Sequence, residues 1–489
     1  MSMMMMMCLC AIGLLSFCLE HVMALASLPS PISGEGWPEK FPAKEHCSRC
    51  GLCETTFVSR VKEACAFLGD GMGRVDDAEM KVHGRQRDTA SMAWSENKDR
   101  GEDLSTADEA RFGVMHEPMR LAKGIGMRDA QWTGVVTSIA LSMLEAGKVD
   151  AVVCIANSSE ESNKSNPQAW SYPQPILAKT PEDVLRGRGV KPALSPSLNV
   201  LDEIKNDKSI RKLLFCGVGC AVQAFRAVQD DLGLEEVYVL GTNCVDNSPT
   251  PEAAQNFLQE GVQISELERV RGYEFMQDFK VHVKTSDGYI TRPYFSLPGT
   301  VAAPSIATSC LACFDYTNGL ADVVVGYMGA PLDGKMDESY QTLTIRNERG
   351  SQMVETAKDA NRLYIGDVAT GTGNHEQLAT STVAADSIVL EMVGGDVPTS
   401  GMPVWMGNIL AFVISNYVSP KGVNFARYSI DYHILRNYLH ILQEWGEDRA
   451  QQAMPQYAAD IVSHYLQDET VRKLQSQLQI TKQEKELKR

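Results

Sequence analysis

Short apolar runs alternate with helical segments through the middle of the chain. Apolar residues at helical spacing over Gly134–Ala146 predict a helix, and the run Val149–Ile155 predicts a buried strand. The alternation continues with strand Arg211–Phe215, helix Cys220–Asp230 and strand Val237–Leu240. Buried strands that alternate with helices are typical of a parallel sheet. The pattern therefore predicts an α/β fold with a mainly parallel sheet core.

The flanking segments predict smaller units around this core. Asp88–Arg111 is polar and charged without an apolar period, so we expect a surface loop, and 366–400, rich in Gly, Thr, Ser, Ala and Asp, predicts a linker or loop. Met402–Val418 is apolar with aromatic residues, and two interpretations stay open: a packed helix, or a surface that contacts a membrane or an apolar ligand. The other predicted elements are a hairpin of Phe279–Val283 and Gly288–Phe295, strands Ala321–Val325 and Thr342–Arg346, and helices Ile430–Glu447, Met454–Leu466 and Val471–Arg489. The expected segments are a leader (1–35), an N-terminal cysteine-rich module with a polar loop (36–110), an α/β domain (111–365), the linker (366–400) and a C-terminal helical region (401–489).

The first segment has the features of a targeting sequence. An apolar stretch, Ile12–Cys18, precedes the small residues Ala24–Ala26, and no Lys or Arg occurs before Lys40. A secreted protein would be a poor setting for oxygen-sensitive redox chemistry, which the cysteine motifs of this chain indicate. A signal-like leader and a misassigned start stay open, and we expect the first half of a two-part presequence that leads into a plastid (chloroplast).

Charge and cysteine content narrow the function. Lys and Arg number 46 against 62 Asp and Glu, a net charge of −16, which argues against nucleic acid as a partner because phosphate binding relies on basic residues. The chain has thirteen cysteines, which is too many to be explained as ordinary core residues. Cys154 lies alone in an apolar run and predicts a buried residue.

The first cysteine group is compact. Cys47, Cys50 and Cys53 follow C-x-x-C-x-x-C spacing, Gly51 gives their loop backbone freedom, and Cys65 follows on a helical segment. Such a loop can cover one face of a 4Fe–4S cube while a fourth thiolate comes from elsewhere. Zinc usually takes two cysteine pairs and disulfides at this spacing are strained, so both alternatives are less favoured.

The second group is dispersed. Cys216 and Cys220 lie between a strand and a helix, Cys244 follows the next strand, and Cys310 and Cys313 form a C-x-x-C pair. Four ligands from three loops predict a second 4Fe–4S site, with unrelated core cysteines as the alternative.

Clusters that pass single electrons need a two-electron partner for organic chemistry, and flavin is the usual one. Gln131–Ser138, with Gly and hydroxyl residues at a helix start, can cradle a pyrophosphate. Arg188–Pro196 is a second candidate, a proline-rich loop with a single central lysine. No G-x-G-x-x-G follows a strand, so a nicotinamide site is not supported.

Several motifs together resemble one known family. The segments Cys47–Phe67, Ala130–Gly134, Gly189–Pro192, Phe215–Cys220, Gly241–Asn247, Tyr273–Asp278 and Ser309–Tyr316 resemble the beta-subunit family of deazaflavin-reducing hydrogenases, and more closely its phototroph branch. The resemblance implies FAD and two 4Fe–4S clusters, with reduced ferredoxin as the electron donor to a reductase of chlorophyll-type tetrapyrroles. The favoured substrate group is the 7-hydroxymethyl group, because Phe215–Gly217, Thr242–Cys244 and the stretch Gly407–His433 look closer to the branch member that reduces it. The 8-vinyl group on the same scaffold is the second alternative, and a non-catalytic electron-transfer or tetrapyrrole-binding protein is the third.

The resemblance also implies roles for individual residues. One cluster would take Cys47, Cys50, Cys53 and Cys65, and the other Cys220, Cys244, Cys310 and Cys313, with Cys216 left over. Flavin contacts would come from Thr133, Gly134, Thr137, Lys191, Ser195 and Asn243. The candidates for the proton donor that a departing hydroxyl needs are Asp246, Asp278, Asp315, Tyr316 and His433. Because ferredoxins are acidic, we expect docking on a local basic patch of Arg60, Lys62, Lys81, Arg85 and Arg87.

Overall fold

An eight-stranded sheet organises the described part of the chain, which in this computed structural model comprises residues 47–68, 71–90, 92–94, 108–157, 169–332 and 334–487. The strand order is β11-β1-β10-β9-β5-β4-β2-β3. The bounds are β1 (Arg120–Gly124), β2 (Ala151–Asn157), β3 (Pro173–Ala178), β4 (Lys212–Gly217), β5 (Glu236–Thr242), β9 (Val323–Gly326), β10 (Gln341–Ile345) and β11 (Leu363–Val368).

The centre and the edges of this sheet differ in direction. β2, β4, β5 and β9 are parallel neighbours, which confirms the predicted parallel core. β3 on one side and β10, β1 and β11 on the other pair antiparallel, so the whole sheet is mixed. The parallel strands are apolar runs buried on both faces, whereas β1 and β11 carry polar residues and gave no strand signal in the sequence.

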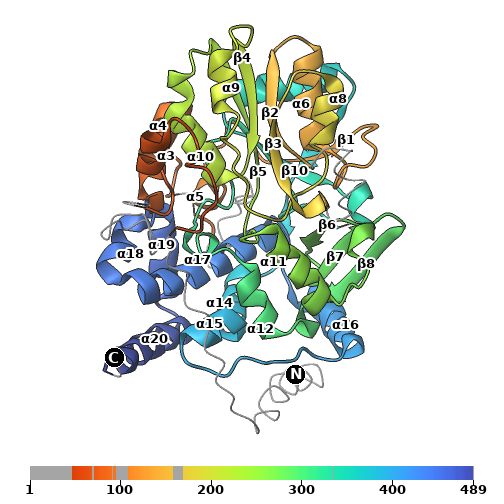
Figure 1. The fold of residues 1–489 in the computed structure, drawn as a ribbon. Helices are drawn as coiled ribbons and strands as arrows, with labels where there is room; N and C mark the ends of the chain where they lie inside the picture. Colours follow the sequence, from red (N-terminus) through yellow and green to blue (C-terminus); the bar gives the residue numbers. More distant parts are fainter. Residues whose placement is uncertain are drawn as a thin grey trace. The chain divides into compact units, whose positions relative to one another are not determined.

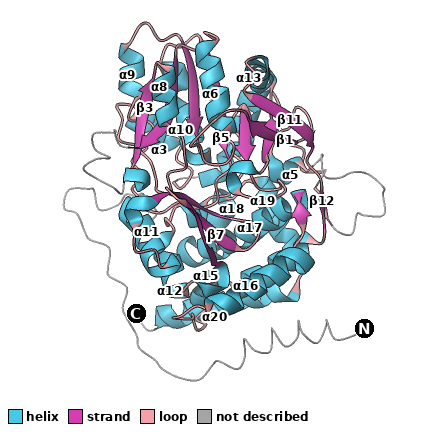
Figure 2. Ribbon diagram, turned by 90° about the vertical axis from the view of Figure 1, so that its right-hand side faces the viewer, coloured by secondary structure: helices cyan, strands magenta, loops and turns pink. Residues whose placement is uncertain are grey.

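Alternate residues of the central strands supply two separate cores. Val152 and Cys154 of β2 point to one face, and Ala151 and Val153 to the other. The first face is covered by α6 (Val135–Glu145), α8 (Pro181–Arg186) and α13 (Glu348–Asp359). The second face packs on α10 (Gly219–Val228) and is continuous with the core of the C-terminal helices. Figures 1 and 2 show these helices on the sheet and the C-terminal helices at its lower end.

The remaining elements surround this centre. Antiparallel β6 (Val270–Phe275), β7 (Lys280–Thr285) and β8 (Gly288–Pro293) form a second sheet, which confirms the predicted hairpin, and β12 (Gly371–Thr372) pairs with β13 (Lys421–Gly422). The other helices are α3 (Val58–Glu63), α4 (Val75–His83), α5 (Glu109–Phe112), α9 (Leu201–Asn206), α11 (Pro251–Asn256), α12 (Gly299–Ala302), α14 (His375–Ala385), α15 (Ser387–Met392), α16 (Val404–Val413), α17 (Val423–Trp445), α18 (Glu447–Ala453), α19 (Gln456–Tyr465) and α20 (Glu469–Leu487). The predicted C-terminal helical region is therefore confirmed.

Two flanking predictions were wrong. The expected linker contains α14 and α15, which are capped by the side chains of Asn374 and Asp386 and bury Ala379, Val383 and Val389. The apolar stripe by which these helices pack on α17 is narrow, and the many small polar residues around it obscure the helical period in the sequence.

The end of the expected Asp88–Arg111 surface loop is also buried. Arg111 is enclosed and forms ion pairs with Asp108 at 2.9 Å and Asp431 at 2.7 Å. A charge-rich sequence is normally exposed, but here opposite charges, one of them from α17, compensate the buried guanidinium. Residues 95–107 and the predicted leader lie outside the described residues, and the other segment boundaries stay predictions.

Among the helices that the structure describes, none combines the length and the apolar character that crossing a membrane requires.

Candidate functional site

The first cysteine loop, with Cys47, Cys50 and Cys53, is fixed by contacts at its end. It leads into α3, and Cys65 lies just after that helix. Arg74 donates hydrogen bonds to the carbonyl oxygens of Cys65 and Leu68, and Gln223 of α10 donates to that of Ala64 at 3.0 Å. These bonds bring Cys65 back towards the loop beside the start of α10.

The same loop touches two other predicted segments. Ser48 Oγ lies 2.5 Å from Ser309 Oγ, next to Cys310. Gly51 has φ of 78°, and a Cβ there would lie 2.7 Å from the Cβ of Pro196. Only glycine permits this left-handed turn at so close an approach. The first cysteine set therefore packs against both the second set and the Arg188–Pro196 segment.

The second cysteine set gathers around the sheet's C-terminal edge and α17. Cys220 is in the first turn of α10, Cys244 follows β5, and Cys310 begins a short turn that ends before Cys313. Asn437 of α17 donates hydrogen bonds to the carbonyl oxygens of Cys310 at 2.8 Å and Cys313 at 2.7 Å. A buried amide thus holds the C-x-x-C turn in place.

Burial disfavours the charged form of the thiols in both sets, and the nearby Lys62, Arg74 and Arg436 offset this effect only in part. Burial raises the pKa of Cys50 to about 11 and of Cys310 to about 12, and it raises the pKa of Cys53, Cys65, Cys220, Cys244 and Cys313 in the same direction. Asn247 Nδ2 donates a hydrogen bond to Cys244 Sγ at 3.2 Å, which favours a thiolate there. Bound iron would supply the compensating charge, so the donor set fits a thiolate-ligated group.

The thiols of each predicted set lie near one another: Cys47 is close to Cys50, Cys53 and Cys65, and Cys244 is close to Cys220, Cys310 and Cys313. Cys50 also lies near Cys220, so the two sets adjoin. Cys154 and Cys216 lie apart, buried beneath α6 on the opposite face.

Within the described ranges, no group of three or more His, Cys, Asp or Glu side chains is placed to hold a single metal ion. A cube distributes its four thiolates over four irons, and such ligands need not converge on one point. The assignment of the two ligand sets stays a prediction.

The two candidate flavin segments meet each other and the second set. Gln131 Oε1 accepts a hydrogen bond from Val190 N at 3.3 Å, and Ser248 pairs with Pro192 and Leu194 just after Cys244. Trp132 Nε1 and Ser195 Oγ are buried without a hydrogen-bond partner among the described residues. Buried polar atoms are normally satisfied, so these two orphans, one in each segment, fit a bound ligand.

The other predicted flavin residues are buried or make hydrogen bonds within the protein. Thr133 Oγ1 accepts from Gly124 N at 3.0 Å, and Gly134 starts α6 with φ of 77°. Thr137 is buried in α6, and Asn243 Nδ2 lies 3.4 Å from the carbonyl oxygen of Tyr316. Lys191 Nζ donates to the carbonyl oxygens of Gly187, Arg188 and Gly189, and burial lowers its pKa to about 7. Direct flavin contact by these residues stays a prediction.

Three of the five proton-donor candidates lie together beside the second cysteine set. Arg436 binds Asp246 through two bonds of 2.9 Å and, against burial, holds the pKa of that carboxyl below its usual value. Tyr316 Oη donates to the carbonyl oxygen of Cys313 at 2.7 Å, and its ring centroid lies 5.8 Å from that of His433. Burial lowers the pKa of His433 to about 4, so this imidazole is neutral.

The other two candidates are in different surroundings. Asp278 pairs with His282 at 2.9 Å on the β6–β7 hairpin. Asp315 accepts from Gly319 N at 2.7 Å, its Oδ2 has no partner among the described residues, and burial raises its pKa.

Glu274 of β6 is a candidate acid that was not predicted from the sequence. Gln131 Nε2 donates to its Oε1 at 2.9 Å, and Tyr327, whose ring stacks on Trp132 at 4.8 Å, lies beside it. Burial raises the pKa of Glu274 to about 7, which suits an acid that donates a proton near neutral pH. It lies within the Tyr273–Asp278 motif, but only the fold shows that it, rather than Asp278, adjoins the Trp132 turn.

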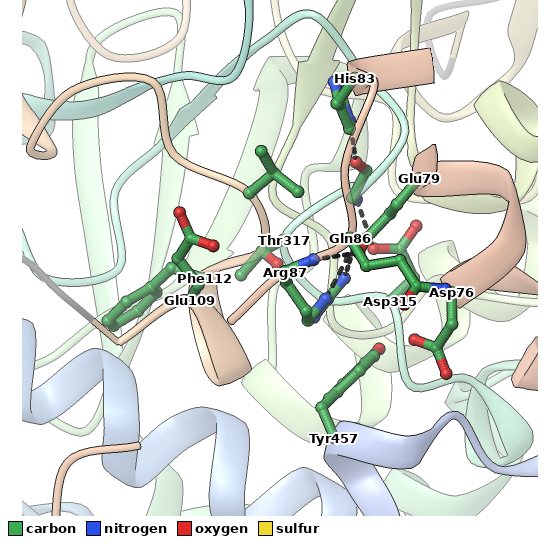
Figure 3. Close-up of polar contacts among 12 residues, drawn as sticks. Asp76, Glu79, His83, Gln86, Arg87, Glu109, Phe112, Asp315, Thr317 and Tyr457 are labelled. Carbon is green, nitrogen blue, oxygen red and sulfur yellow. Dashed lines mark hydrogen bonds and ion pairs between the residues drawn. The ribbon is translucent and has the colours of Figure 1, made fainter. Parts of the chain in front are cut away.

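The predicted docking patch is wrong at Arg87. Figure 3 shows this guanidinium among Glu79, Asp315 and Tyr457, and its side chain is 2% exposed. Its Nε donates to Glu79 Oε1 at 2.9 Å and its Cζ lies 3.9 Å from the centre of the Tyr457 ring. Arg85 pairs with Glu109 at 2.5 Å and is half-exposed, while Arg60 and Lys81 are paired with Asp231 and Asp230 at the surface. A run of basic residues in the sequence does not show which of them are buried in ion pairs and which are exposed.

A mixed α/β sheet with two adjoining cysteine sets at one edge is the framework of the site, and comparison with known families assigns this framework to a class of oxidoreductases. Residues 123–202 match the N-terminal part of the family described as coenzyme F420 hydrogenase/dehydrogenase, beta subunit, and residues 210–370 match the C-terminal part of the same family. The chain belongs to this family, which confirms the resemblance identified from its motifs.

Individual relatives make the relationship more specific. The chain is 46% identical over 431 residues to 7-hydroxymethyl chlorophyll a reductase, chloroplastic, of Oryza sativa subsp. japonica, covering 88% of this chain and 84% of the relative. It is 39% identical to an uncharacterised protein of Nostoc, covering 87% and 94%. The beta subunit of coenzyme F420 hydrogenase from Methanosarcina barkeri is 24% identical, covering 46% and 72%.

Proposed function

We infer that this chain is an oxidoreductase that converts the 7-hydroxymethyl group of 7-hydroxymethyl chlorophyll a to the methyl group of chlorophyll a. The observation that carries this inference is the 46% identity to the rice reductase over most of both chains. The reaction consumes two electrons and two protons and releases water.

Two 4Fe–4S clusters and FAD are the cofactors that the donor residues support. Cys47, Cys50, Cys53 and Cys65 would hold one cluster, and Cys220, Cys244, Cys310 and Cys313 the other. The Trp132–Thr137 turn, Lys191–Ser195 and Asn243 would hold FAD. When bound, the clusters pass single electrons and the flavin collects two for the organic substrate. The contact of Gly51 with Pro196 and the pairing of Leu194 with Ser248 support short separations between all three sites.

The residues of this chain would supply the protons. Loss of the hydroxyl oxygen as water requires a proton on that oxygen, and an acid with a pKa near the working pH donates most effectively. Glu274 meets this condition next to the Trp132 turn. Asp246 does not, because Arg436 keeps it ionised, and this pair instead steadies the loop after Cys244.

We propose reduced ferredoxin as the donor and the plastid as the compartment, since the rice relative is named chloroplastic. The docking surface would use Arg60, Lys62, Lys81 and Arg85 near the first cysteine loop, without Arg87. Exposed charges of this kind steer an acidic partner chiefly at low ionic strength.

The test is anaerobic turnover of the cluster-loaded protein with reduced ferredoxin and an equal mixture of 7-hydroxymethyl chlorophyll a and divinyl chlorophyllide. Chromatography should show chlorophyll a and unchanged divinyl pigment. Reduction of the vinyl pigment alone would establish the 8-vinyl reductase instead, and no reduction of either would favour a non-catalytic electron-transfer or tetrapyrrole-binding protein. Loss of activity in a Cys310→Ser variant would tie the product to the second cysteine set.

A further inference from the structure

Helix α16 is oriented with its small residues inwards. Gly407 and Ala411 are buried, and a Cβ at Gly407 would lie 2.4 Å from Ser296 Oγ and 3.1 Å from Pro293 Cβ. The helix therefore docks closely on the end of β8 through its glycine. A helix that served only to complete the core would place its large apolar residues on this side.

The large residues of α16 and of the following turn point outwards instead. Trp405 is 66% exposed, Ile409 58%, Phe412 57% and Tyr417 72%. Trp405, Ile409 and Phe412 recur at i, i+4 and i+7, so they form one continuous stripe. Val404, Met406, Val413 and Val418 border the stripe and are exposed as well. Figures 1 and 2 show α16 at the end of the described unit that lies away from the eight-stranded sheet.

This surface carries no charge over a long stretch. The sequence has no Asp, Glu, Lys, Arg or His from Val397 to Pro420. Scattered exposed apolar residues are common, but a contiguous set of this kind marks an interaction surface.

We propose that the outward face of α16, with Tyr417, binds the interface of a lipid bilayer. Trp and Tyr at the ends of a stripe with Ile and Phe at its centre are the composition of helices that lie in that interface. A protein partner would be expected to meet a polar rim with charges to match, and none occurs on this segment. The ten residues of α16 extend about 15 Å, half of the roughly 30 Å of a hydrocarbon core, so the helix would lie in the interface.

Charge selects the type of lipid. The chain has a net charge of −16, and the first charged side chain after the segment is the single Lys421. Helices that bind anionic lipid carry several basic residues on the polar face, and this one has none. The lipid surface is therefore a neutral one.

Such a surface would place the enzyme where its substrate dissolves, and this last step alone rests on the proposed function. A chlorophyll-type pigment with an apolar tail partitions into a bilayer, so binding there would raise its local concentration. The binding itself follows from the exposed side chains and can be measured without turnover.

The experiment uses the full chain with vesicles of phosphatidylcholine at about 0.1 M salt, where charge effects are already screened beyond about 10 Å, read by co-sedimentation. We expect binding that falls about tenfold or more in a Trp405→Ser/Phe412→Ser variant, because both large apolar side chains would leave water when the helix enters the bilayer interface. Ile480→Ser on α20 is the matched control, since Ile480 is also 57% exposed, and it should bind like the unaltered protein. Phosphatidylglycerol should not strengthen the binding.

A second readout guards against a folding defect in the variant. Vesicles with bromine in the acyl chains should quench tryptophan fluorescence of the intact protein, and Trp405→Phe should remove that quenching while binding persists. No sedimentation with neutral vesicles would overturn the proposal. So would a double variant that binds normally, or light scattering that shows the apolar face buried between copies of the chain in the presence of vesicles. None of these results would affect the pigment assay.

Discussion

The buried pair of Arg87 and Glu79 gives the sharpest test of how the first cysteine segment is attached to the rest of the protein. Both side chains are almost fully enclosed, at 2% and 0% exposed, and Glu79 also accepts from the Arg87 backbone N–H at 3.1 Å. The perturbation is Glu79→Gln, which keeps the shape of the side chain and removes its charge. The guanidinium would then lose the carboxylate to which it is hydrogen-bonded, with Asp315 as the remaining nearby carboxylate and Arg346 as a nearby like charge.

The magnitude follows from the cost of an uncompensated buried charge. Removing one partner of a buried pair destabilises a protein by about 3–5 kcal/mol. The unit from Pro42 to Arg489 has an unfolding entropy of roughly 0.9 kcal/mol/K at about 2.1 cal/mol/K per residue, so the melting temperature should fall by about 3–5 °C.

The assay is thermal unfolding under anaerobic conditions with the cofactors bound. The control is Asp230→Asn, which breaks the Lys81–Asp230 pair whose side chains are 66% and 65% exposed. An exposed pair contributes about 0–1 kcal/mol, so that variant should shift by about 1 °C or less. Equal shifts in the two variants, or no shift in Glu79→Gln, would refute the structural role of Arg87 and reopen its assignment to a docking surface.

Three further predictions follow from the site. Glu274→Gln should lower turnover by about 10²- to 10⁴-fold with little change in KM for the pigment, measured by chlorophyll a formation, whereas Asp278→Asn should retain most activity. Burial lowers the pKa of His83 to about 4 from 6.5, so its stability contribution is present above pH 6.5 and is lost as pH falls towards 4; melting curves from about pH 7 to 5 should show a shallower decline in His83→Gln. Asn437→Ala should remove one hydrogen bond from each of the carbonyl oxygens of Cys310 and Cys313, destabilise that turn by about 1–3 kcal/mol and lower iron retention, while Asn424→Ala on the same helix should not.

Strong periodicity explains why the centre of the fold could be predicted. Strands β2, β4 and β5 are apolar runs between helices, and their order of appearance already implies parallel pairing. β1 and β11 were missed because they pair at the edge with mixed polar and apolar residues. Helix α14 was missed because its buried stripe consists of Ala and Val among Ser and Thr.

The candidate site shows the same division. Cysteine spacing alone separated two groups, and the fold brings the two groups together but places Cys216 of the second group on the opposite face of the sheet. The burial of individual charged residues could not be predicted from the sequence, although it determines what each can do. Arg87 is enclosed in an ion pair, and burial raises the pKa of Glu274 towards neutral pH. Long-range partners such as Asn437 also depend on tertiary packing, because they lie more than a hundred residues from the loops that they support.

The central claim is that two adjoining sets of four cysteines each hold a cluster. The most direct measurement is iron and acid-labile sulfide per chain in anaerobically purified protein, for the unaltered sequence and for Cys310→Ser/Cys313→Ser. Two 4Fe–4S clusters per chain require about eight irons and eight sulfides, and loss of the second cluster in the variant should leave about four of each. Zinc in place of iron, or the same iron content in both proteins, would contradict it.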